Sequence, residues 1–157
     1  MKNLFSAATF IVVLALTFNA SASGSAPPQT RDSAKRTIKR DMQMKAEDAL
    51  EQMRMAYTEN NLDHFFGNVS ESPSLNHTDL KFRAAKSFKD FNQTELRITV
   101  DHALTENDKV FLKTHWQKRA VSRSSGSSQT SSGDAGFTFK IEENDAKLIQ
   151  ISGDSPF

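Results

Sequence analysis

Cysteine is absent from the 157 residues of this chain. Disulfides, zinc–thiolate sites, thiol catalysis and cysteine lipidation are therefore excluded. An excess of one charge is also lacking, because 20 Lys and Arg balance 19 Asp and Glu to a formal net charge of +1. No electrostatic argument for a nucleic-acid partner follows. Tryptophan and tyrosine occur once each, whereas twelve phenylalanines supply bulky apolar side chains for a core. The length corresponds to about one domain.

Long hydrophobic runs are lacking as well, and the one notable run lies at the amino terminus. Lys2 precedes a mostly apolar segment at 7–18, and Ala20-Ser21-Ala22 has the small residues that a signal peptidase accepts. A helix of that length rises about 18 Å, too little for a bilayer core of about 30 Å. We predict a signal peptide at 1–22, a periplasmic or extracellular location, and no stable membrane span after cleavage. Cleavage after Ala26 and an uncleaved anchor are the alternatives.

The segment 23–45 links this signal to the folded domain. Residues 23–30 are rich in Ser and Pro, which predicts a flexible leader. Residues 31–45 hold six basic and two acidic residues, a pattern typical of the solvated start of a long helix. A basic arm that touches an anionic membrane or a partner is the alternative. We assign the domain itself to 46–157.

Apolar residues at helical spacing predict three helices in the first half of the chain. The second helix begins after Asn61, which suits a helix cap, and ends near Gly67. The third runs from about Asn76 to about Phe91. The first helix has the longest apolar stripe, formed by Ile38, Met42, Ala46, Ala49, Leu50, Met53 and Tyr57.

The pattern then changes to a period of two, which predicts antiparallel strands. The first strand spans 95–104 and the second spans 110–117, with a turn between them. The third resumes at 137–141 after a Ser-rich segment, 122–134, which we interpret as a mobile hairpin tip. In the last strand, at 146–152, Leu148 points to one face and the pair Ile149 and Ile151 to the other, which predicts a bulge or burial on both sides. On the first strand the apolar face comprises Leu96, Ile98, Val100, His102 and Leu104.

Three helices followed by about four strands predict an α+β fold, with helices packed on a curved antiparallel sheet. Four segments together resemble the nuclear transport factor 2-like superfamily, also called the cystatin-like α+β cone. They are Tyr57 to Phe65 with Asn61-Leu62-Asp63, Lys109-Val110-Phe111-Leu112 to Trp116, Gly136-Phe137-Thr138-Phe139, and Lys147-Leu148 to Ile151-Ser152-Gly153-Asp154.

This resemblance covers about 46–157 and implies a cone that encloses a pocket. Members of the superfamily include ketosteroid isomerase-like enzymes, polyketide cyclases, dehydratases, ligand binders and dimeric interaction domains. A fold with so many functions assigns no single function to this chain.

Three residues are candidates for acid–base chemistry in such a pocket. His102 is the ionisable residue on the apolar face of the first strand and suits a general base. The hydroxyl of Tyr57 suits an oxyanion donor, and Asp63 suits a second base. Each also has a structural interpretation, as a rim histidine, a core-margin tyrosine or a capping carboxylate. The predicted pocket lining is Tyr57, Phe65, His102 and Trp116.

No cofactor or metal is expected from the local motifs. The four histidines form no HxxxH or HxH pair. The sequence also has no GxGxxG motif, Walker loop or GxSxG motif. The histidines are His64, His77, His102 and His115.

Three hypotheses for the function remain open. We favour a secreted, non-catalytic domain that binds an apolar or amphipathic small molecule or a protein. The first alternative is an isomerase, cyclase or dehydratase that uses His102 with Tyr57 or Asp63. The second is an assembly domain, a homodimer that forms through the sheet face around Phe111 and His115.

Overall fold

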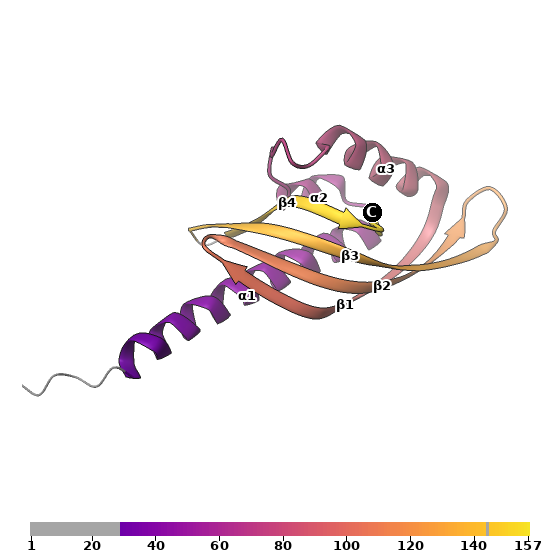
Figure 1. The fold of residues 1–157 in the computed structure, drawn as a ribbon. Coiled ribbons are helices and arrows are strands. Elements are labelled where there is room, and N and C mark those ends of the chain that lie inside the picture. Colours follow the sequence, from indigo (N-terminus) through magenta and orange to yellow (C-terminus); the bar gives the residue numbers. More distant parts are fainter. Residues whose placement is uncertain (1–28, 144) are drawn as a thin grey trace, which may run out of the picture.

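The computed structural model describes residues 29–143 and 145–157. The predicted signal peptide at 1–22 and most of the predicted leader lie outside the described residues. Three helices precede four strands, in the predicted order (Figure 1). The elements are α1 (Gln29–Thr58), α2 (Leu62–Gly67), α3 (His77–Asp90), β1 (Phe91–Glu106), β2 (Lys109–Ser122), β3 (Ser128–Glu142) and β4 (Asp145–Gly153).

The four strands form one antiparallel sheet in the order β1-β2-β3-β4. The sheet curves, and the helices pack against one side of it (Figure 1). The buried residues of α1 and α3 and the inward residues of the strands form a single hydrophobic cluster. The predicted α+β fold is therefore confirmed.

Asn61 and Asn76 cap the first turns of α2 and α3, and the cap at Asn61 was predicted from the sequence. The side chain of Asn61 accepts a hydrogen bond of 3.1 Å from the backbone N–H of His64. The side chain of Asn76 accepts one of 3.0 Å from the N–H of Asp79. Each bond satisfies a donor that the first turn of a helix leaves without an intrahelical partner.

The long helix α1 has two distinct parts. From Ala46 onward its apolar stripe is buried against the sheet, and Met53 and Tyr57 are almost fully enclosed. Every side chain from Asp32 to Asp41 is exposed, and this part projects beyond the sheet (Figure 1). Neither α1 nor any other helix in the described part of the chain is both long and apolar enough to cross a membrane.

Strand β1 contains a bulge that overturns one prediction. Val100 pairs with Thr114 and His102 pairs with Lys113, so Asp101 is an extra residue. One extra residue inverts the alternation of the strand. His102 and Leu104 are therefore exposed on the outside of the sheet, and the prediction that they share its apolar face is wrong.

The Ser-rich segment is only partly a hairpin tip. Pairing of β2 with β3 continues to Val121 and Ser128, so the connection is limited to residues 123–127. The third strand thus begins about nine residues before the predicted start. Backbone hydrogen bonds need no apolar side chains, and therefore serine and threonine extend this end of the hairpin beyond the core.

The predicted irregularity in the last strand is a bulge. Thr138 pairs with Gln150 and Phe139 pairs with Leu148, so Ile149 is the extra residue. This shift lets both Leu148 and Ile151 face the core. It also places Leu148 beside Val69, to which β4 is joined by a parallel bridge.

Candidate functional site

The chain turns back into its own cone after β4. Gly153 makes this turn with a positive φ of 74°, where an added Cβ would lie 2.7 Å from the carbonyl oxygen of Asp134. The segment 154–157, called the tail below, then brings Pro156 and Phe157 into the hydrophobic interior, where both are buried. Glycine suits this turn because it has no Cβ to clash with the neighbouring strand.

Phe157 occupies the place predicted for a pocket. Its ring centroid lies 4.9 Å from that of Phe65, 5.2 Å from that of Tyr57 and 5.9 Å from that of Phe137. These are the distances of packed aromatic pairs. The aromatic residues of the interior therefore enclose a side chain of the same chain.

Two inward residues of β2 hold the tail through its backbone. The indole Nε1 of Trp116 donates a hydrogen bond of 2.6 Å to the carbonyl of Asp154. The ammonium of Lys118 donates one of 2.7 Å to the carbonyl of Pro156. Its Nζ also lies 5.6 Å from the ring centroid of Tyr57, within the range of a cation–π contact.

Three of the four residues predicted to line a pocket do lie in this interior. Tyr57, Phe65 and Trp116 are 1%, 0% and 6% exposed. The hydroxyl of Tyr57 donates a hydrogen bond of 2.7 Å to Oγ of Ser87 in α3. The phenol is thus bonded within the protein.

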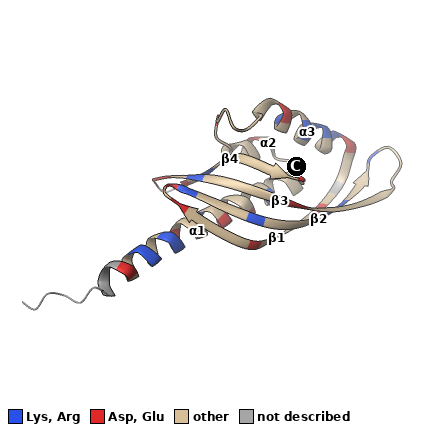
Figure 2. Cartoon of the chain, in the orientation of Figure 1, with Lys and Arg blue, Asp and Glu red and all other residues tan. Residues whose placement is uncertain are grey.

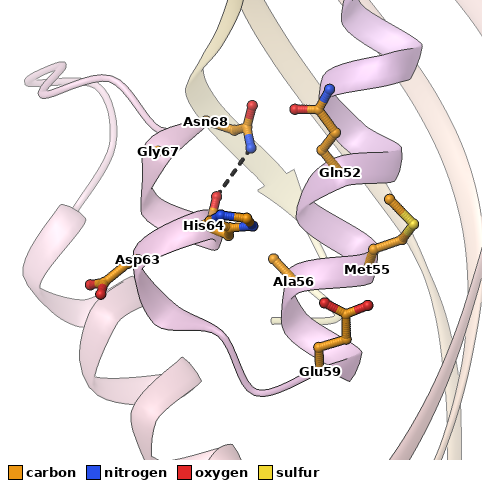
Figure 3. A pocket seen from close by; sticks show the side chains of 8 residues that line it. All are labelled: Gln52, Met55, Ala56, Glu59, Asp63, His64, Gly67 and Asn68. Carbon is orange, nitrogen blue, oxygen red and sulfur yellow. Dashed lines mark hydrogen bonds between the residues drawn. The ribbon is translucent and has the colours of Figure 1, made fainter.

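The other two candidate acid–base residues lie elsewhere. His102 is on the outside of the sheet because of the bulge in β1. Asp63 is exposed in the first turn of α2, and its carboxylate points away from α1 (Figure 3). The structure therefore does not bring His102, Tyr57 and Asp63 together in one pocket.

An open groove lies on the outer surface, between α1 and α2 (Figure 3). Its volume is about 480 Å³. Met55 and Ala56 of α1 add apolar atoms to its lining, and Glu59 and Asp63 add two carboxylates at its edge. A smaller hollow continues from Gln52 and Asn68, which border both spaces. We call the two together the α1–α2 groove.

Sequence reasoning missed this groove, although a signal for it exists. The helix α1 and the turn after it contribute four residues that lie three or four positions apart, Asp48, Gln52, Met55 and Glu59. That spacing places them on one face of the helix. The stripe is mixed in polarity, so it does not stand out beside the apolar stripe of the core.

The outside of the sheet, where assembly was predicted, carries both polar and apolar side chains, and the exposed Leu104 pairs with Phe111 there. Nδ1 of His115 lies 3.1 Å from a carboxylate oxygen of Asp134 on the neighbouring strand. Phe111 lies over Gly136, where an added Cβ would be 2.6 Å from its ring. Phe111 is therefore half-buried against the sheet rather than projecting from it.

No cluster of three or more metal-binding side chains occurs within 29–143 and 145–157. The only buried side-chain polar atom without a hydrogen bond in this part of the chain is Oγ1 of Thr105. A single hydroxyl does not define a metal or cofactor site.

Comparison with known proteins identifies the fold. No protein-family model matches the sequence, and no curated protein matches it. A nuclear transport factor 2-like superfamily protein from Salmonella enterica serovar Typhimurium is similar in structure, with a TM-score of 0.61. The two share 13% identity over 78% of this chain and 94% of that chain.

Two further solved structures agree. A conserved protein from Planctomyces limnophilus has a TM-score of 0.63 and 11% identity, over 69% of this chain and 91% of that chain. A type 2 hexachlorocyclohexane dehydrochlorinase has a TM-score of 0.62 and 9% identity, over 77% of this chain and 90% of that chain. The chain therefore has the nuclear transport factor 2-like fold, as its sequence pattern indicated. Identities this low establish the fold alone.

Proposed function

We propose that this chain is a non-catalytic binding domain that acts on a protein partner through the outside of its fold. The observation that carries the proposal is the position of Phe157 inside the cone. The interior that would hold a substrate is occupied by the tail. The α1–α2 groove is open and is lined by both apolar and polar residues, as protein-binding surfaces are.

The hydrogen bonds of the interior support the same proposal. Tyr57 is bonded to Ser87, Trp116 to the tail at Asp154, and Lys118 to the tail at Pro156. A catalytic pocket needs donors and bases that are directed at a substrate. An enzyme of the isomerase, cyclase or dehydratase type is therefore the less favoured alternative, although one similar structure is a dehydrochlorinase.

A small-molecule binder is the second candidate, and one contact favours it. Lys118 binds a carbonyl of the tail while Phe157 fills the aromatic interior. A ligand with an aromatic ring and a carbonyl or carboxylate has the same chemistry and would compete with the tail.

Ligand titration separates these two proposals. Trp116 is the single tryptophan of the chain, and its indole is bonded to the tail, so its fluorescence reports whether the tail is in place. We expect phenylacetate and 3-phenylpropionate, which do not fluoresce as indoles do, to leave the emission and the melting temperature of the wild-type protein unchanged. As a positive control, Phe157→Ala opens an apolar space that benzene enters. Saturable binding of either acid to the wild-type protein, with a shift in emission, would overturn the proposal in favour of the small-molecule binder.

We also propose that the chain is exported to the periplasm or the exterior, on the strength of the sequence at 1–22. The intact mass of the protein recovered from its own cells tests this. A chain that begins at Ser23 supports export with the predicted cleavage, and a chain that begins at Pro27 supports export with the alternative site. A chain that retains Met1 would contradict both.

A further inference from the structure

The projecting part of α1 lacks packing contacts, which suggests that another protein surface packs against it. All side chains from Asp32 to Asp41 are exposed, and Ile38 has 59% of its surface in solvent. A helical segment of about ten residues gains little stability in water without packing against another surface. The first buried residue of α1 is Ala46, more than a turn beyond this segment.

One face of α1 has the spacing of a helix–helix seam from Ala34 to Met55. Its positions alternate in steps of four and three residues, which is the 3.5-residue period of paired helices. The carboxyl-terminal half of this face borders the α1–α2 groove, and the amino-terminal half lies on the projecting segment. The seam consists of Ala34, Ile38, Asp41, Lys45, Asp48, Gln52 and Met55, and Glu59 continues it in the turn after α1.

We propose that a second copy of this chain occupies the groove, with its α1 antiparallel to the first α1. A two-fold axis between Lys45 and Asp48 then pairs Lys45 of each copy with Asp48 of the other. The same axis pairs Ile38 with Met55, two of the large apolar side chains that this structure leaves exposed. It also pairs Asp41 with Gln52 and Ala34 with Glu59. Each pair occurs twice, as a two-fold interface requires.

The charges at the centre of the seam are complementary. Lys45 and Asp48 carry opposite charges, and the two-fold axis places each of them against the other. Opposite charges of this kind select partner and orientation. The ammonium of Lys45 also donates to the carbonyl of Glu143. The other cations of the projecting segment follow Ala34 and Ile38 by one or two positions, at about 100° per residue, so they face away from the seam and stay in solvent (Figure 2). These cations are Lys35, Arg36, Lys39 and Arg40.

The antiparallel direction follows from the same residues. A parallel pair in register would place Asp48 against Asp48 and Lys45 against Lys45, and like charges in contact are unfavourable. The antiparallel pair replaces both repulsions with attractions. It also covers the projecting segment of each copy with the groove of the other.

Cysteine cross-linking tests this arrangement without background, because the chain has no cysteine of its own. We expect Ile38→Cys/Met55→Cys to form a covalent dimer under mild oxidation. These positions are seventeen residues apart on one helix, about 26 Å, so they cannot join within one copy. The single variants Ile38→Cys and Met55→Cys are matched controls and should stay monomeric on a denaturing gel. A double variant that does not cross-link, or single variants that cross-link equally well, would overturn the proposal.

Charge reversal at the centre of the seam gives an independent test by sedimentation equilibrium. Asp48→Lys opposes Lys45 of the other copy at two symmetric places, so we expect the dimer to weaken about tenfold or more, since each lost pair and each new repulsion contributes up to about 1 kcal/mol. Lys45→Asp/Asp48→Lys should restore association. A double variant that associates as weakly as Asp48→Lys would contradict the pairing.

This inference rests on the proposed function, because it names the occupant of the groove. Its failure remains distinct from a failure of that proposal. A wild-type chain from residue 23 that stays monomeric overturns the dimer, whereas the ligand titration alone decides whether the cone is closed. A monomer that binds vesicles of anionic lipid would assign the basic segment to a membrane surface and would also overturn the dimer.

Discussion

The indole nitrogen of Trp116 donates a hydrogen bond of 2.6 Å to the backbone carbonyl of Asp154. Through this bond, β2 in the wall of the cone binds the tail of the same chain. An added Cβ at Gly133, which pairs with Trp116 across the sheet, would lie 2.9 Å from the indole ring. Glycine at this position therefore leaves room for the orientation in which the indole reaches the tail.

Removal of the Phe157 side chain should strongly destabilise the protein. Its ring is 5% exposed and packs against several other aromatic rings. Truncation of a buried phenylalanine costs about 3–5 kcal/mol, and relaxation of the tail should keep the loss near the lower value. Urea unfolding of Phe157→Ala measures the loss. Phe82→Ala is the matched control, because Phe82 is 67% exposed and should change stability by less than about 0.5 kcal/mol. Equal effects of the two substitutions would show that the tail does not belong to the core.

The bond between Tyr57 and Ser87 should be structural rather than catalytic. Its length of 2.7 Å and its burial indicate a hydrogen bond that joins α1 to α3. Each of Tyr57→Phe and Ser87→Ala should lower the free energy of unfolding by about 1 kcal/mol. The double variant should lose less than the sum, because the second substitution can no longer remove the bond between the two hydroxyls. Additive losses would show that the two hydroxyls do not interact.

Local signals in the sequence predicted most of the elements. Period and caps indicated the helices, and alternation indicated the strands. The bulge at Asp101 could not be predicted, because the sequence alternates without interruption through His102 and Leu104. Which face these side chains take depends on the pairing of β1 with β2. The early start of β3 was missed because serine-rich strands pair through their backbones and have no apolar pattern.

The candidate site was predictable only in part. Tyr57 and Phe65 lie near one another in the sequence, on elements whose inward faces were identified. Phe157 follows the last strand, and nothing local specifies that it enters the cone. Its position depends on the turn at Gly153 and on contacts with residues about forty to one hundred positions earlier.

Aspartate substitutions at Ala103 and at His102 test which of these neighbouring residues of β1 faces the core. Ala103 packs against the core after the bulge, whereas His102 faces solvent. Ala103→Asp would bury a carboxylate without a partner and should cost at least about 2 kcal/mol. His102→Asp should change the free energy of unfolding by less than about 0.5 kcal/mol. If the two effects were reversed, the strand would follow the alternation of its sequence and would contain no bulge.

The pair of Glu51 and Arg54 should make stability depend on pH in a defined direction. The guanidinium of Arg54 donates two hydrogen bonds, of 2.6 and 2.7 Å, to the carboxylate of Glu51. These bonds hold the pKa of Glu51 below its ordinary value of 4.5. A third bond, of 3.1 Å, joins Arg54 to the carbonyl of Leu96, so the pair also fixes the rotation of α1 against β1.

Because the pKa of Glu51 is lower in the folded chain than in the unfolded chain, its contribution is complete above the unfolded pKa and disappears as the pH falls through the folded pKa. Glu51→Gln should therefore be less stable than the wild-type protein at pH 7 and equally stable once the pH is well below 4.5. The carboxylate side chain is 54% exposed, so solvent limits the difference at pH 7 to less than about 0.5 kcal/mol. Urea unfolding of both proteins between pH 7 and pH 3 measures it. If the difference in unfolding free energy persisted unchanged at low pH, the charge of the Glu51 carboxylate would not contribute to stability.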